Sequence, residues 1–144
     1  MALPDGRIIE PSLLVGPSRR GRKIVLTGDT RPCDATIEIA RDADVLVHEA
    51  TFGDEEADRA AETGHSTARE AAIVARRAEV RRLVLTHLSA RYSRDVSELE
   101  REAREEFPNT TIARDGTEVE VGYEDAVGLE TLRTSDCGLR TQRP

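Results

Sequence analysis

Three short apolar runs rich in β-branched residues alternate with segments of helical patterning, and this alternation strongly constrains the fold. The runs cover residues 23–27, 44–48 and 82–86. Each has the length of a strand and is apolar on both faces, which is typical of strands buried in a parallel sheet. Helical patterns occupy 34–43 and 67–80. The alternation predicts an α/β domain whose parallel strands are covered by helices.

Caps, breakers and turn residues indicate three further elements: an exposed helix, an amphipathic helix and a β-hairpin, which would make the sheet mixed. Asp34 is the expected N-cap of the first helix, and Thr67 forms a capping box with Glu70 in the second. The exposed helix is expected at 54–63, ended by Gly64, and the amphipathic helix from Ser93 or Asp95 to Pro108. The hairpin is expected to pair 110–114 with 118–121 around a turn at Asp115-Gly116.

The two ends of the chain differ from this patterned region. Residues 1–22 are rich in proline and glycine and predict a turn-rich entry with at most one short strand at 7–9. Residues 125–144 show no periodicity, so we expect a poorly ordered tail. The domain is therefore expected to span 1–124.

Composition excludes several classes of protein. The 144 residues carry 21 basic and 28 acidic side chains, and a net charge of −7 argues against indiscriminate binding to nucleic acid. No apolar run is long enough to span a membrane, and the first residues lack the apolar core of a signal peptide. Two cysteines, Cys33 and Cys137, are too few for a disulfide scaffold. We expect a cytoplasmic protein with neither a membrane nor DNA as its partner.

Each apolar run is followed by a side chain that can bind a metal or transfer a proton. Asp29 lies just beyond the first run, His48 ends the second run and is followed by Glu49, and His87 directly follows the third run. His65 precedes the capped helix. Because ligands of α/β proteins bind beyond the carboxyl ends of the strands, these side chains could converge on one edge.

Such a set suits zinc or manganese, and a two-metal site can activate water for attack on a phosphodiester. For each residue taken alone, a structural role is the more common one: a histidine at a strand end, a turn-forming Asp29, or His65 in a helix-start segment. Asp29 and all three histidines together would still leave two ions short of ligands.

Four motifs in order resemble ribonuclease Z, the metallo-β-lactamase-superfamily endonuclease that trims the 3′ ends of tRNA precursors. The resemblance covers about residues 5–123. HEAT followed by HST is its most specific part. The motifs are Gly28-Asp29-Thr30-Arg31-Pro32, His48-Glu49-Ala50-Thr51-Phe52, His65-Ser66-Thr67 and Thr86-His87-Leu88-Ser89-Ala90-Arg91-Tyr92.

The resemblance implies a fold and a role for each motif residue. It implies half of the superfamily's αββα sandwich, a mixed sheet with helices on one face. Asp29 would bridge two zinc ions and His87 would bind one of them, with manganese possible. His65 would act at the scissile phosphate, with Glu49 and His48 orienting it. Arg31, Thr67 and Arg91 would contact substrate, and no organic cofactor is implied.

One motif of the resembling family is absent. The family's HxHxDH metal motif does not occur in these 144 residues. The sequence therefore resembles the C-terminal half of the enzyme, and we expect the chain alone to bind zinc weakly and to be inactive. An exposed apolar sheet face would favour a homodimer or pairing with an N-terminal half-chain. Precursor tRNA is the implied substrate.

Two alternatives and one open assignment remain at the level of the sequence. The chain could be a different metallo-β-lactamase-fold hydrolase, acting on a small phosphodiester or ester, or a non-catalytic assembly module. Basic clusters at 18–23 and 75–82 could contact tRNA phosphates, although such runs are more commonly solvated faces.

Overall fold

A computed structural model of the chain describes residues 20–122, and its centre is a four-stranded parallel sheet. The strands are β1 (Ile24–Leu26), β2 (Val45–Glu49), β3 (Leu83–Thr86) and β4 (Thr110–Ile112), hydrogen-bonded in that order. Every neighbouring pair runs in the same direction. Because the strands are parallel, the chain leaves β1, β2 and β3 at one common edge of the sheet.

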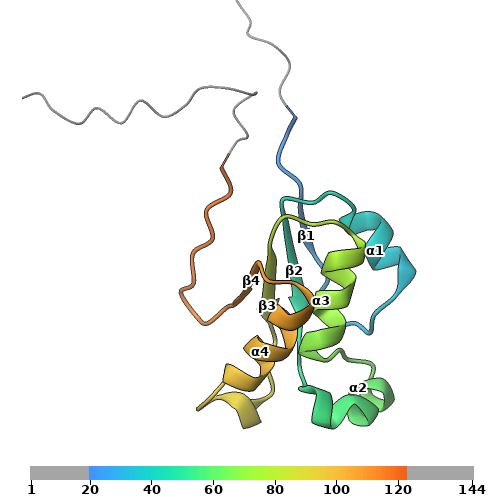
Figure 1. The fold of residues 1–144 in the computed structure, drawn as a ribbon, viewed down its shortest axis with the longest axis vertical. Coiled ribbons are helices and arrows are strands. Elements are labelled where there is room, and N and C mark those ends of the chain that lie inside the picture. Colours follow the sequence, from blue (N-terminus) through green and yellow to red (C-terminus); the bar gives the residue numbers. More distant parts are fainter. Residues whose placement is uncertain (1–19, 123–144) are drawn as a thin grey trace, which may run out of the picture. The chain divides into compact units, whose positions relative to one another are not determined.

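Helices fill the connections between these strands and confirm the predicted α/β alternation. Figure 1 shows α1 and α3 on the same side of the sheet, with α4 packed against α3. None of these helices is long and apolar enough to cross a membrane. The helices of residues 20–122 are α1 (Asp34–Ala40), α2 (Ala57–Thr63), α3 (Ala68–Arg77) and α4 (Ser97–Glu106), with 3-10 turns η2 (Asp54–Glu56) and η3 (Ala90–Tyr92).

The core lies between the sheet and the helices. Leucines of β2 and β3 point to this side because alternate strand residues face opposite ways. Small side chains on α3 allow its backbone to approach both the sheet and α4 closely. Five alanines of this face are fully buried, as the helical pattern predicts: Ala68, Ala71, Ala72, Ala75 and Ala78.

The opposite side of the sheet is open at β1. Ile24 and Leu26 are 50% and 71% exposed, whereas Val25 between them packs against the core. The prediction that 23–27 forms a strand is confirmed, but the prediction that the strand is buried is wrong. β1 is an edge strand, and nothing within residues 20–122 covers these two apolar side chains.

The predicted helix ends are correct to within a few residues. The capping box of Thr67 and Glu70 is present, and α3 ends at Arg77 rather than near Val80. Gly64 ends α2 with φ of +79°, a conformation that glycine adopts without strain. α1 begins one residue early, so Cys33 rather than Asp34 occupies its N-cap position.

The region after α4 differs from the predicted hairpin. Thr110–Ile112 forms β4, which pairs with β3 in parallel because α4 carries the chain back along the helical side. The Asp115-Gly116 turn forms, closed by a 2.8 Å bond from Thr117 N to Arg114 O. Residues 118–121 form no strand, so the antiparallel pair of a mixed sheet is missing from residues 20–122. The predicted strand at 7–9 and the tail 125–144 lie outside the described residues.

Candidate metal centre

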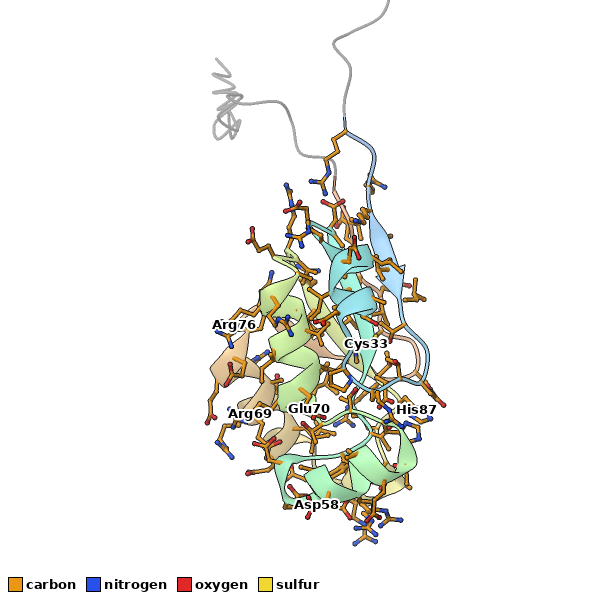
Figure 2. The ribbon with its side chains drawn as sticks, turned by 90° about the vertical axis from the view of Figure 1, so that its right-hand side faces the viewer. Cys33, Asp58, Arg69, Glu70, Arg76 and His87 are labelled. Atoms are coloured by element: carbon orange, nitrogen blue, oxygen red, sulfur yellow. The ribbon has the colours of Figure 1, made fainter. Side chains whose placement is uncertain are left out.

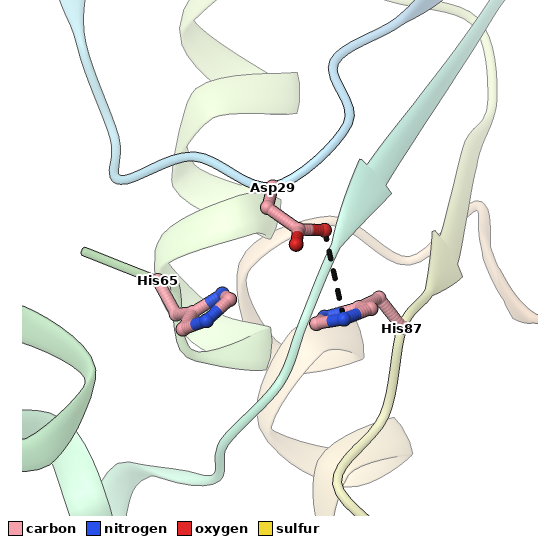
Figure 3. Close-up of side chains that lie close together, drawn as sticks. All are labelled: Asp29, His65 and His87. Carbon is pink, nitrogen blue, oxygen red and sulfur yellow. Dashed lines mark ion pairs between the residues drawn. The ribbon is translucent and has the colours of Figure 1, made fainter. Parts of the chain in front are cut away.

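Asp29, His65 and His87 meet at the carboxyl edge of the sheet (Figure 3), as their places in the sequence predict. Asp29 follows β1 after a turn at Gly28, whose φ is +64°. His87 directly follows β3, and His65 lies between α2 and α3. One donor atom from each residue lies within 4.8 Å of the others, and the Asp29 Oδ1 to His87 Nε2 distance is 3.6 Å.

The backbone at His87 is strained. Its φ of +54° is in the left-handed region, which few residues other than glycine adopt, and such strain is concentrated at functional sites. This conformation turns the chain sharply at the end of β3. The His87 ring thereby stacks on the His65 ring, with centroids 5.3 Å apart and planes 21° apart.

Glu49, only 2% exposed, joins the three segments that carry the cluster. Its Oε1 accepts hydrogen bonds from Thr30 N at 3.0 Å and from His65 Nδ1 at 2.7 Å. Its Oε2 accepts from Thr51 N at 3.1 Å and from Thr51 Oγ1 at 2.7 Å. Burial raises the pKa of Glu49, but these hydrogen bonds outweigh it and hold the pKa below its ordinary value.

A second contact secures the loop that contains Asp29. Ser66 Oγ donates to Thr30 O at 2.7 Å, so Thr30 is bonded through both its amide and its carbonyl. The neighbours of Asp29 and His65 are thus tied together. Asp29 itself stays 61% exposed in its side chain, which leaves it accessible to an ion.

His48 is not part of this cluster. It pairs in register with Leu85, so its fully buried ring points to the helical core while Glu49 points to the opposite face. His48 Nδ1 bonds Glu49 O at 2.8 Å, and burial lowers the pKa of the ring. Its Nε2 has no hydrogen-bond partner within residues 20–122. His48 and Glu49 thus point to opposite faces of β2, and the expected role of His48 in orienting His65 stays a prediction.

The three predicted substrate contacts occupy different environments. Arg31 is exposed, with its guanidinium near Gly64. Arg91 is half exposed and forms an ion pair with Glu56. Thr67 is 1% exposed and its hydroxyl accepts from Glu70 N in the capping box. Contact of Thr67 with a substrate stays a prediction.

Sequence reasoning assigned no role to Thr51, although this residue contacts every imidazole of the cluster. Its hydroxyl lies 2.8 Å from His87 Nδ1 and 3.2 Å from His65 Nδ1. The only signal in the sequence is its spacing from Glu49. Side chains two positions apart lie on the same face of an extended chain. Thr51 continues the face of Glu49 beyond the end of β2.

The donor set fits a transition metal that accepts oxygen and nitrogen ligands. A carboxylate and an imidazole suit zinc or manganese, so Asp29 and His87 could bind an ion, with His65 beside it and coordination positions left open for water or substrate. A second ion needs more donors than this cluster has. The chemistry of the residues therefore fits one metal ion and part of the coordination of a second.

Basic side chains of α3 and the following turn pair with carboxylates instead of forming a free positive patch. Arg76 bonds Glu106 at 3.1 Å, and Arg77 bonds Asp34 at 3.1 Å. Arg69 bonds Asp54 at 2.5 Å. Figure 2 shows Arg69 and Arg76 on the side away from His87. The basic cluster at 75–82 thus forms a solvated, ion-paired face where the structure shows its partners.

Comparisons with known proteins agree with the fold and the motifs. A family model described as "Beta-lactamase superfamily domain" matches residues 11–88. A protein from Gemmatimonas aurantiaca named ribonuclease Z is 71% identical over 119 residues. A ribonuclease Z from Haloferax volcanii is 55% identical over 127 residues. The crystal structure of human tRNase Z, short form, superposes with a TM-score of 0.56 at 36% identity.

The match extends over most of this chain and over a minor part of each relative. The chain is covered for 83% and 88% in the two sequence matches, but it spans only 38% and 40% of those relatives. In the human structure the shares are 71% of this chain and 34% of that one. The family match, the parallel α/β sheet and the Asp/His edge together show that the chain belongs to the beta-lactamase superfamily.

Proposed function

We propose that this chain carries part of the active site of a zinc-dependent endoribonuclease that removes 3′ trailers from tRNA precursors. The convergence of Asp29, His65 and His87 around the buried Glu49 is the observation that supports it most directly. Relatives named ribonuclease Z, at 71% and 55% identity, point to the same substrate.

In this proposal Asp29 and His87 hold metal and His65 serves the phosphate. Zinc, or manganese in its place, would lower the pKa of a bound water and so supply the nucleophile. His65 would donate a proton to the leaving 3′ oxygen. Glu49 orients it, because a carboxylate bonded to Nδ1 fixes the ring and leaves Nε2 facing the cluster.

The ligand count calls for donors beyond those that these 144 residues supply. The whole sequence contains three histidines and no HxH motif, and one of the three is buried away from the cluster. We propose that a chain bearing HxHxDH supplies the remaining ligands and covers Ile24 and Leu26. A homodimer through this face is the alternative. Alone, the chain would bind zinc weakly and leave tRNA precursors uncut, and we place it in the cytoplasm.

Co-expression tests this proposal. The full 144-residue chain is produced with and without a chain bearing HxHxDH, and the purified products are assayed for zinc content and for cleavage of a tRNA precursor. We expect both to rise only in the pair. Asp29→Asn should lose zinc and cleavage together, whereas His65→Ala should keep zinc and lose cleavage. Asp58→Asn, an exposed change on α2, serves as the matched control.

The same assay separates the alternatives. Cleavage of bis-p-nitrophenyl phosphate without any cleavage of tRNA precursor would indicate a different phosphodiesterase. A stable pair that binds no zinc would indicate an assembly module and contradict the proposal. Normal cleavage of tRNA precursor by the unaccompanied chain would show that the partner is unnecessary.

A further inference from the structure

The hydroxyl of Thr51 has more hydrogen-bond contacts than any simple packing role needs. It contacts the Glu49 carboxylate at 2.7 Å, His87 Nδ1 at 2.8 Å and His65 Nδ1 at 3.2 Å. Thr51 is only 8% exposed. All three of its partners belong to the cluster or to the carboxylate that orders it.

The donors and acceptors at this hydroxyl can be assigned by counting. A hydroxyl has one hydrogen and two acceptor lone pairs. Both carboxylate oxygens of Glu49 accept backbone amide hydrogens, from Thr30 N and Thr51 N, so the single hydroxyl hydrogen is donated to Glu49 Oε2. Both lone pairs remain, and each contact with a ring nitrogen must then be a bond that the ring donates.

This assignment fixes the protonated nitrogen of His87. Its Nδ1 carries the hydrogen, since the Thr51 oxygen can only accept there. The other ring nitrogen, Nε2, keeps its lone pair and lies 3.6 Å from Asp29 Oδ1. His65 is ordered in the same way, because its Nδ1 is 2.7 Å from Glu49 Oε1.

We propose that Thr51 is a positioning residue of the metal centre, one that holds His87 in the Nδ1–H form so that Nε2 faces Asp29 and the metal. The inference rests on the proposed metal centre and adds a residue and a ring atom to it. Partners of this kind fix the orientation of metal-binding histidines, and their loss commonly lowers metal affinity about 10–100-fold.

The backbone around Thr51 keeps its hydroxyl in place. Thr51 N donates to Glu49 Oε2 at 3.1 Å, and Thr51 O accepts from Ser89 N at 3.0 Å. The second bond ties the end of β2 to the loop that follows His87. A serine can therefore replace the hydroxyl, whereas a valine keeps the shape and removes it.

The first experiment reads the histidine tautomers directly and needs no metal. Long-range ¹H–¹⁵N spectra of the metal-free, full-length chain are recorded at pH 8, above the ordinary imidazole pKa of about 6.5. The wild type and Thr51→Ser should show His87 in the Nδ1–H form, and Thr51→Val should show a mixture. Thr110→Val is the matched control, because Thr110 is also buried and its hydroxyl donates to Phe107 O instead.

The second experiment measures affinity for Co²⁺, a spectroscopic substitute for zinc, in the same four proteins. Thr51→Val should bind about 10–100-fold more weakly than the wild type, and Thr51→Ser and Thr110→Val should bind as the wild type does. If no protein binds Co²⁺, the proposed metal centre fails while the spectra still test the role of Thr51.

The proposal is overturned if His87 keeps the same tautomer in Thr51→Val, or if it is Nε2–H in the wild type. It is equally overturned if Thr51→Val binds Co²⁺ as tightly as the wild type. A Thr51→Ser protein that behaves as Thr51→Val does would show that the methyl group matters and the hydroxyl does not.

Discussion

At the scale of single residues, one buried carboxylate orders the site. Glu49 bonds segments that are far apart in the sequence, through Thr30, Thr51 and His65. The hydrogen bonds keep it ionised in spite of its burial. Glu102, the other carboxylate buried to 2% exposure in the described part of the chain, has the opposite electrostatics, because burial raises its pKa.

This contrast predicts pH dependences of opposite sign. Glu49 has a lowered pKa in the folded state, so its stabilisation is present above the ordinary carboxyl pKa of 4.5 and disappears as the pH falls through the folded value. Glu49→Gln should cost about 1–3 kcal/mol at pH 7, since buried donors lose an ionic acceptor, and less near pH 3.5. Urea unfolding at the two pH values measures the difference.

Glu102→Gln is the control for this prediction. The folded pKa of Glu102 is raised, so the ionised side chain destabilises the fold at neutral pH, and the wild type regains stability as the pH falls. The deficit of Glu102→Gln relative to the wild type should therefore grow on acidification. A Glu49→Gln deficit that also grows on acidification would show that Glu49 is not held in its ionised form.

The residues of the cluster were predictable where topology alone decides their position. Asp29 and His87 end parallel strands, so both must reach the same edge of the sheet. His48 shows where this reasoning fails. It also lies at a strand end, but side chains alternate along a strand, so His48 and Glu49 point to opposite faces of the sheet. Thr51 has no pattern of its own, and its role depends on distances that only the folded chain supplies.

At the scale of elements, the start of α3 links helix stability to the site. Thr67, two residues after His65, caps this helix. Beyond the end of β2, Phe52 forms a parallel bridge with Thr67. His65 N also donates to Ala60 O at 2.9 Å, which closes the end of α2. The position of His65 is thus set by the end of one helix and the beginning of the next.

Thr67→Ala should destabilise the chain by about 1 kcal/mol, the usual cost of losing an N-cap side chain. Thermal unfolding followed by circular dichroism provides the measurement. Thr63→Ala is the matched control, because Thr63 is exposed at the end of α2 and its hydroxyl bonds only the Arg59 carbonyl there. Equal losses for the two variants would show that the capping box contributes nothing beyond an ordinary threonine.

Elements with complete local signals were predicted, and those that depend on distant partners were not. The capping box and the alanine face of α3 both lie within residues 67–78, and both are present. The strand alternation at 118–121 is just as local, yet a strand exists only where a neighbour pairs with it. Thr110–Ile112 pairs with β3, and the pairing is parallel because α4 returns the chain to the starting edge of β3.

At the scale of the whole molecule, the exposed apolar side chains of β1 mark the face on which the proposed partner would bind. Ile24 and Leu26 share the face opposite the helices, and this face adjoins the edge that carries Asp29. An apolar edge strand left open is a site of association or aggregation.

Leu26→Lys should therefore weaken association of the chain, either with itself or with a chain bearing HxHxDH. Analytical ultracentrifugation measures this, because a buried lysine charge opposes an apolar interface. Ile39→Lys is the matched control: Ile39 is 63% exposed on α1, on the helical side. Association that resists Leu26→Lys but is lost in Ile39→Lys would place the interface on the helices instead.

The central claim is that Asp29 and His87 bind a metal ion at the open edge of the sheet, beside His65. Titration of the full-length chain with Zn²⁺, followed by NMR, tests this most directly and detects weak binding. The largest shifts are expected on Asp29, His87 and the residues around them, and these shifts should vanish in His87→Ala. Shifts that fall elsewhere, or that persist unchanged in His87→Ala, would contradict it.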